Sequence, residues 1–299
     1  MNKVLYGYIS ATSGALIWGV VPLYYNLLNE FAFIEVVVQR IFWACIIFSI
    51  VFIFQKRFSE IGTALCSIKN LILFLVCAIL ISANWLFFIF AIQHGQLMQS
   101  ALGYYIYPLF TAALGYFFLG ESIEKKMKIA LIFAVIAVFV KSSSLSNFPW
   151  IAISMAVTFA AYAIIRKQLK VKSDIGLMIE TTMLMPVALL YFGMQVNYSI
   201  PLFFGGNFIG LVLAIFCGLF TIIPLYLFHN GNKILPLSVA GFIFYLNPTS
   251  QMFISILLGE DYNFKDICVF ILIWLGLIIQ FSPILFISNI RLGSKTNKL

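Results

Sequence analysis

The chain has 299 residues, of which 63% are hydrophobic and only 9% are charged, and its formal net charge is +8. Soluble domains carry about 25% charged residues, and a water-soluble fold of this length could not bury so much apolar surface. The composition therefore excludes a soluble protein and indicates an integral membrane protein.

Apolar runs of about 17–25 residues predict membrane-spanning helices, because a rise of about 1.5 Å per residue must cross roughly 30 Å of hydrocarbon. Ten such runs follow one another along the chain, at residues 7–28, 32–54, 71–93, 96–118, 127–143, 148–166, 175–193, 208–230, 236–258 and 264–287. The alternation of polar and apolar residues that marks a transmembrane β-barrel is absent from these runs. The predicted fold class is all-α, a polytopic membrane protein with ten transmembrane helices.

The basic residues predict how these helices are oriented. Of the 18 Lys and Arg residues, 15 fall in the connections and termini of one side, only Lys141 and Lys265 fall on the other, and Arg40 lies inside a predicted helix. Because short cytoplasmic loops are enriched in Lys and Arg, both termini are predicted to be cytoplasmic. The positive charge is explained by this topology, so no nucleic-acid partner is expected.

An internal repeat divides the chain into two halves. Residues 101–121, "ALGYYIYPLFTAALGYFFLGE", align with residues 240–260, "AGFIFYLNPTSQMFISILLGE", and both segments contain an aromatic run, a central proline and a final "LGE". Five helices per half place the second half in the opposite orientation, so we predict inverted repeats over residues 1–143 and 144–299. Inverted repeats are typical of secondary transporters, which bind substrate near the membrane midplane between the halves.

Nine motifs in one order resemble the RarD branch of the EamA family, which belongs to the drug/metabolite transporter superfamily. They are "ALIWGVVPLYYNLL", "QRIFW", "ANWLFFIFAIQHG", "SALGYYIYPL", "FLGE", "AYAIIRK", "IETTMLMP", "TIIPLYLF" and "LPLSVAGFIFYLNPT". The resemblance implies a 5+5 inverted-repeat carrier of small organic metabolites or drugs in the bacterial inner membrane. The chain departs from polar residues typical of the family at Gln39, Gln99, Tyr107 and Phe244.

Two prolines mark the candidate site. Pro108 and Pro248 occupy near-equivalent positions of the repeat, and each is predicted to break its helix near the midplane, although both could be simple structural kinks. Aromatic and amide side chains near the midplane suit an amphipathic solute, because they provide apolar contact and orientation without a fixed charge. The predicted substrate-binding residues are Trp18, Asn84, Trp85, Tyr104, Tyr107, Tyr162, Tyr226, Tyr245, Asn247 and Gln251.

Two charged residues inside predicted helices are candidates for a charge pair or for coupling. A charged side chain inside the membrane normally faces the protein interior and has a partner. Arg40 and Glu180 occupy corresponding positions of the two halves, and we predict that they pair directly or through water. Alternatively, Arg40 caps freed backbone carbonyls or pairs with Glu35, and Glu180 becomes the candidate proton carrier.

Signals for other classes of protein are missing from the sequence. It contains no P-loop, HExxH or GxSxG motif and no CxxC pair among its five cysteines, so no catalytic residue, cofactor or metal site is expected. The predicted function is secondary transport by alternating access, as an exporter or exchanger. A membrane-embedded enzyme and a passive facilitator remain the alternatives. The expected partners are the lipid bilayer, a small-molecule substrate, and protons or a counter-substrate, and the chain is expected to act as a monomer or dimer.

Overall fold

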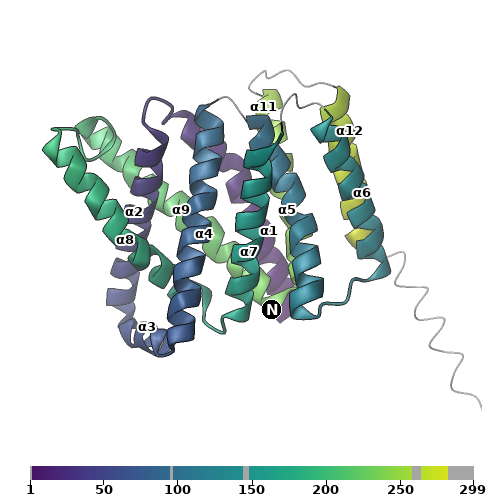
Figure 1. Ribbon diagram of the computed structural model, residues 1–299, viewed down its shortest axis with the longest axis horizontal. Coiled ribbons are helices and arrows are strands. Elements are labelled where there is room, and N and C mark those ends of the chain that lie inside the picture. The colour runs from purple at the N-terminus through teal and green to yellow at the C-terminus, as the bar shows by residue number, and fades with distance from the viewer. Residues whose placement is uncertain (1, 95–96, 144–147, 258–263, 282–299) are drawn as a thin grey trace, which may run out of the picture.

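The computed structural model describes residues 2–94, 97–143, 148–257 and 264–281, and all regular elements within these residues are helices (Figure 1). The predicted all-α class is therefore confirmed. The C-terminus and the C-terminal ends of the ninth and tenth predicted spans lie outside the described residues. The helices are α1 (Lys3–Asn26), α2 (Phe33–Gln55), α3 (Phe58–Leu65), α4 (Ile68–Gln93), α5 (Leu97–Leu119), α6 (Lys125–Ser142), α7 (Trp150–Gln168), α8 (Ser173–Asn197), the 3₁₀ turn η1 (Phe204–Gly206), α9 (Phe208–Ile234), α10 (Leu237–Ile243), α11 (Leu246–Leu257) and α12 (Phe264–Phe281).

Seven of the described helices are long and apolar enough to cross a membrane. They are α1, α2, α4, α5, α7, α8 and α9, and each coincides with a predicted span. The fifth predicted span corresponds to the 18-residue α6, which carries lysines at both ends, and the tenth begins with α12. A polytopic helical membrane protein is thus confirmed, and the count of ten spans stays a prediction. The short α3 was not predicted and fills the connection between the second and third spans.

The ninth predicted span is divided into α10 and α11. The division falls at Phe244 and Tyr245, one turn before Pro248. Pro248 has no backbone N–H, so the carbonyl of Phe244 accepts a 2.9 Å hydrogen bond from Asn247 instead of the usual donor four residues on. Pro108, by contrast, lies inside the continuous helix α5, so the predicted break at Pro108 is corrected to an intact helix.

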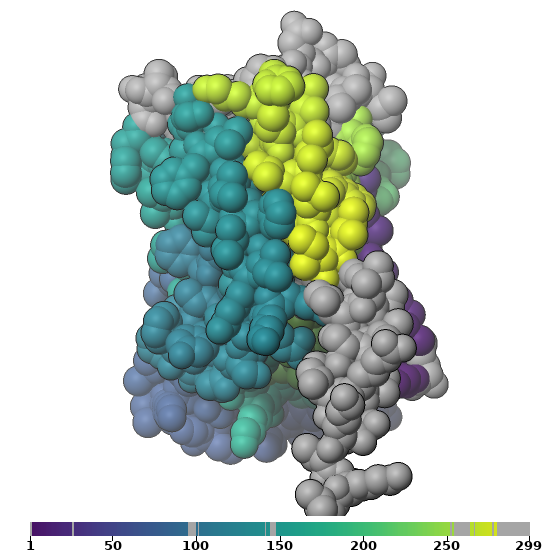
Figure 2. All heavy atoms as spheres, turned by 90° about the vertical axis from the view of Figure 1, so that its right-hand side faces the viewer, coloured from purple at the N-terminus to yellow at the C-terminus, as the bar shows by residue number. Residues whose placement is uncertain are grey.

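Several helix contacts recur between the two predicted halves. We match α1, α2, α4, α5 and α6 in order with α7, α8, α9, α10–α11 and α12. The contact of α1 with α9 then corresponds to that of α7 with α4. In the same way, α1 with α11 corresponds to α7 with α5, and α2 with α9 corresponds to α8 with α4. The pairs α2–α8, α5–α10 and α6–α12 correspond to themselves, and α6 and α12 form one end face of the molecule (Figures 1 and 2). This pattern is what a two-fold relation between the halves requires.

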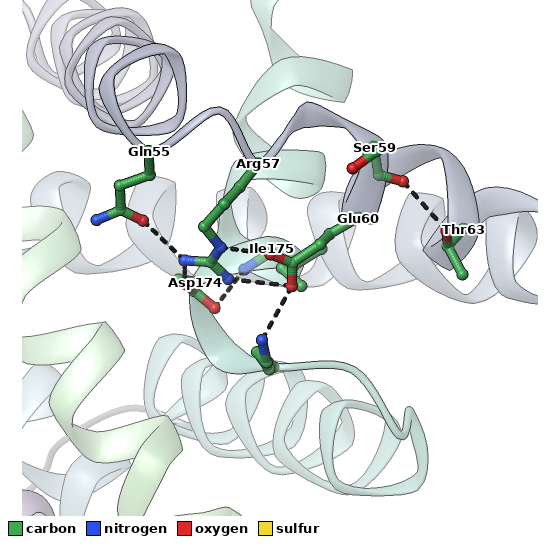
Figure 3. A network of polar contacts seen from close by, with 8 residues as sticks. Gln55, Arg57, Ser59, Glu60, Thr63, Asp174 and Ile175 are labelled. Atoms are coloured by element: carbon green, nitrogen blue, oxygen red, sulfur yellow. Dashed lines mark hydrogen bonds and ion pairs between the residues drawn. The ribbon is translucent and has the colours of Figure 1, made fainter.

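A cluster of charges joins α3 to the start of α8 (Figure 3). Arg57 Nε lies 2.5 Å from Glu60 Oε1, and Arg57 Nη1 lies 2.6 Å from Asp174 Oδ2. Lys172 Nζ lies 3.0 Å from the other oxygen of Glu60. The hydrogen bonds from Arg57 and Lys172 lower the pKa of Glu60 to about 2, and those to Glu60 and Asp174 raise the pKa of Arg57. The cluster thus ties the two halves together at the end of the bundle where α3 lies.

Candidate substrate cavity and buried charges

A small cavity lies between the helices of the two halves. Its volume is about 30 Å³, which is room for about one or two water molecules. The lining residues come from α1, α2, α4 and α5 of the first half and from α7, the α10–α11 junction and α11 of the second. They are Trp18, Val21, Tyr25, Arg40, Ile81, Asn84, Trp85, Phe88, Tyr104, Phe159, Phe244 and Asn247. Pockets that hold small organic ligands are about ten times larger, so this conformation leaves no room for such a ligand in the cavity.

Aromatic rings form most of the cavity wall. The ring centroid of Trp18 lies 5.8 Å from that of Phe159 and 5.6 Å from that of Phe244, both with edge-to-face geometry. The centroids of Tyr104 and Phe244 are 5.4 Å apart. The break between α10 and α11 places Phe244 where rings of α1, α5 and α7 converge. Edge-to-face contacts of this kind stabilise packing by about 0.5–1.5 kcal/mol each beyond the apolar area that they bury.

The two asparagines in the wall are held by hydrogen bonds. Asn84 Nδ2 donates to the carbonyl of Met155 at 2.9 Å and to Thr158 Oγ1 at 3.3 Å, which joins α4 to α7. Asn247 Oδ1 accepts a 2.8 Å hydrogen bond from Gln251 Nε2 within α11. Both amides therefore have fixed orientations at the cavity.

The structure brings half of the predicted binding residues together in this wall. Trp18, Asn84, Trp85, Tyr104 and Asn247 line the cavity, and Gln251 supports Asn247. The remaining four lie elsewhere. Tyr107 packs behind the wall with its ring centroid 4.7 Å from Phe159, Tyr162 belongs to the charged cluster described below, Tyr226 is half-buried on α9, and the Tyr245 hydroxyl donates to the carbonyl of Tyr105.

Several apolar lining residues could not be identified from the sequence. Val21, Ile81, Phe88 and Phe159 resemble ordinary core residues in the sequence, because nothing in their type separates a cavity wall from a packed interior. Tyr25 follows Tyr24 near the end of α1 and was likewise not singled out. The side chain of Gln99 lies outside the described residues.

Arg40 lies in the cavity wall, and only 3% of it is exposed. Its Nε donates a 3.0 Å hydrogen bond to Thr221 Oγ1 on α9. The guanidinium carbon lies 4.7 Å from the ring centroid of Trp85 and 5.4 Å from that of Tyr25. Arg40 therefore contacts the second half through the hydroxyl of Thr221, while the two rings that face its guanidinium belong to its own half.

The predicted pair of Arg40 with Glu180 is corrected by the structure. Glu180 pairs with Arg166, whose Nε lies 3.1 Å from Glu180 Oε1, and both side chains are at most 2% exposed. The Tyr162 hydroxyl donates to Glu180 Oε2 at 2.9 Å and accepts from His229 Nε2 at 2.8 Å. The physical reason is reach, because Arg166 and Tyr162 lie one helical turn apart on α7, level with Glu180 on α8.

Further polar contacts close the same end of the bundle. Lys167 Nζ lies 2.9 Å from Glu121 Oε1 and donates to the carbonyl of Leu235 at 2.6 Å. Glu121 also accepts hydrogen bonds of 2.8 and 2.9 Å from the backbone N–H of Leu237, where α10 begins. Lys233 Nζ donates to the last carbonyls of α7. These contacts join the ends of α5, α7 and α9 to the start of α10.

These features define a class of protein: a polytopic helical membrane transporter whose two halves enclose a central cavity. The chain belongs to the EamA-like transporter family, which it matches over residues 5–143. It is 34% identical to the "Uncharacterized transporter YojE" of Bacillus subtilis, with 91% of this chain and 92% of that protein covered. It is 31% identical to the protein RarD of Escherichia coli, with 91% and 93% covered. The resemblance to the RarD branch is thereby confirmed.

A solved crystal structure of another protein shows the same fold. Its TM-score is 0.70 over 92% of this chain and 96% of that chain, at 13% sequence identity. At this level of identity the likeness extends to the fold alone.

Proposed function

We infer that the protein is a secondary transporter that moves small organic metabolites or drugs across the bacterial inner membrane by alternating access. The observation that carries this inference is the central cavity, because helices of both halves line it and its volume of about 30 Å³ is too small for such a solute. A substrate can therefore occupy this site only if the halves move apart on one side. The symmetric helix contacts support the inverted repeats over residues 1–143 and 144–299 that such a movement needs.

Polar contacts at the helix ends support a proposal for which side of the cavity is closed. Lys167, Glu121 and Lys233 join α5, α7, α9 and α10 at the end of the bundle where α1 begins, the lower end in Figure 1. The distribution of Lys and Arg predicts that this end, with both termini, is cytoplasmic. We place a cytoplasmic gate there, which opens by separating these contacts.

The chemistry of the cavity wall favours transport over catalysis. The twelve described lining residues include no carboxylate, histidine, serine or cysteine, which are the usual general acids, bases and nucleophiles. Aromatic walls with a few oriented amides suit reversible binding of an amphipathic solute. Export or exchange, driven by protons or by a counter-substrate, completes the proposal.

The test is a ligand-stabilisation screen on detergent-purified protein, with amino acids, nucleosides, amines and amphenicols as probes. A ligand that binds only the folded state raises the apparent unfolding temperature with the logarithm of its concentration. Trp18→Ala, Asn84→Ala and Asn247→Ala should each weaken the response to a binding probe, whereas Trp150→Ala, outside the cavity, should leave it unchanged. Unaltered binding in all three cavity variants would move the site elsewhere. Uptake of the same probe into proteoliposomes under an imposed pH gradient, or with trapped counter-substrate, distinguishes the two modes of coupling.

A further inference from the structure

Arg40, a residue of the cavity wall, has a donor without a partner among the described residues. Its Nη1 is fully buried and has no hydrogen-bond partner among the described residues. No carboxylate of the described residues forms an ion pair with it. Its hydrogen-bond acceptor within the described part of the chain, Thr221 Oγ1, is a neutral hydroxyl that donates its own proton to the carbonyl of Cys217 at 2.6 Å.

A second unsatisfied group lies beside it. The Tyr25 hydroxyl is buried without a hydrogen-bond partner among the described residues, and the Tyr25 ring lies 5.4 Å from the Arg40 guanidinium carbon. Both residues line the cavity. Burying a polar group without a hydrogen-bond partner costs free energy, and burying a charged group costs more. Two neighbouring donors without partners are therefore expected to bind a ligand that supplies an acceptor.

The charge of the cavity is not balanced from within. Arg40 is the single charged residue among the twelve described residues that line it, and a guanidinium stays protonated in any protein environment. The rings of Trp85 and Tyr25 stabilise the cation through their faces but accept no conventional hydrogen bond. One positive charge and two donors without a partner among the described residues therefore belong to side chains of the cavity wall.

We propose that the substrate is an organic monocarboxylate with an aromatic or apolar body, and that Arg40 and Tyr25 bind its carboxylate group. This rests on the proposed function and names the class of solute that the same site takes. A carboxylate carries one charge and two acceptor oxygens, which match the fork of a guanidinium. A phosphate ester, with nearly two charges, would bury an excess negative charge against a single arginine.

The rest of the wall matches the body of such a solute. Trp85, Phe88, Tyr104 and Phe244 offer ring faces and edges, and an apolar body gains free energy in proportion to the surface that it removes from water. The same wall contains no acid that could neutralise an ammonium group. The site is therefore expected to prefer acids to amines of the same shape.

The experiment compares four probes that share one body and differ in the head group: phenylpropanoate, phenylpropanamide, phenylpropylamine and phenylpropyl phosphate. The unfolding temperature of the purified full-length protein is followed against probe concentration at neutral pH and fixed ionic strength, which gives a dissociation constant for each. Phenylpropanoate should bind at least about tenfold more tightly than its neutral isostere, phenylpropanamide. Tighter binding of the amide, the amine or the phosphate would overturn the monocarboxylate assignment while leaving a substrate site in place. No response to any of the four would count against the cavity as a binding site, and so against the proposed function itself.

Variants identify the residues responsible. Arg40→Gln should abolish the preference for the acid over the amide, and Arg40→Lys, which keeps the charge without the fork, should retain part of it. Tyr25→Phe removes only the hydroxyl and should reduce the preference without reversing it. Arg57→Gln, outside the cavity, is the matched control and should bind all four probes as the native chain does. A preference for the acid over the amide that survives in Arg40→Gln refutes the assignment. If Arg40→Gln does not fold, an undiminished preference in both Tyr25→Phe and Arg40→Lys refutes it instead.

Discussion

Removing Arg166 should destabilise the protein far more than removing any exposed arginine. Arg166 and Glu180 are buried, and their charged atoms are 3.1 Å apart. At this distance, with an effective dielectric constant of about 20, the Coulomb attraction is about 5 kcal/mol. Arg166→Met keeps the volume of the side chain but leaves the Glu180 carboxylate with the Tyr162 hydroxyl and no cation within ion-pair distance. Breaking a buried pair in this way costs about 3–5 kcal/mol.

A double-mutant cycle tests this reasoning. The free energy of unfolding is measured in mixed detergent micelles, by tryptophan fluorescence, for Arg166→Met, Glu180→Met and the double variant. Because the double variant buries no unpaired charge, its loss should be smaller than the sum of the two single losses by about 2 kcal/mol or more. Additive losses would show that the two side chains do not interact and would refute the pairing. Arg57→Met, whose ion pairs with Glu60 and Asp174 are only partly buried, serves as the control and should have a smaller effect.

Three further outcomes are expected. A Cβ at Gly176 would clash with the guanidinium of Arg166, so Gly176→Ala should destabilise the protein by about 1–3 kcal/mol. Gly193→Ala, with open space around it, should stabilise the protein by about 0.5–1 kcal/mol in the same unfolding assay. The pKa of Glu60 is about 2 in the fold and 4.5 in the unfolded chain. Its contribution to stability is therefore present above about pH 4.5 and is lost as the pH falls towards 2. Glu60→Gln should reduce the change in unfolding temperature with pH over this range. A reporter fused at Leu299 should be active in the cytoplasm, and activity outside would contradict the ten-helix topology.

The spans could be predicted because lipid constrains each residue separately. Every backbone polar group in the bilayer must be satisfied within its own helix, so a run of apolar residues is sufficient to locate that helix. The seven long apolar helices accordingly begin and end within a few residues of the predicted spans. The division of the ninth span at Phe244 is a different matter, because Pro108 and Pro248 have the same local chemistry and only one of them interrupts its helix. The difference is therefore not visible in the local sequence, and in the fold Gly241 of α10 lies directly against Pro108 and Thr111 of α5.

The partner of Glu180 could have been found from the sequence by another route. Alignment of the two halves identifies equivalent positions, and equivalent positions need not touch. The short connection between α7 and α8 predicts which residues of these helices are neighbours, because residues equally far from its centre lie at the same depth in the bundle. Tyr162 and Glu180 are each nine residues from Val171, and Arg166 and Gly176 are each five residues from it. Gly176 and Glu180 lie one turn apart on α8 as Tyr162 and Arg166 do on α7, so the absence of a side chain at Gly176 leaves room for the guanidinium beside the carboxylate.

Two buried arginines therefore have opposite explanations in one molecule. Arg166 has a buried carboxylate partner and joins α7 to α8, so its charge is compensated within the fold. Arg40 has a hydroxyl and two aromatic rings, and among the described residues its Nη1 has no acceptor. A leucine or methionine would pack at either position without the cost of burying a charge, and only at Arg166 would the substitution leave an opposite charge behind. A charge that the fold itself does not need, placed in the wall of a cavity, is the pattern expected where a function and not stability requires the residue. Arg40→Met should accordingly leave the unfolding free energy nearly unchanged or raise it while abolishing the preference for an anionic solute, and a loss as large as that of Arg166→Met would show that Arg40 is structural after all.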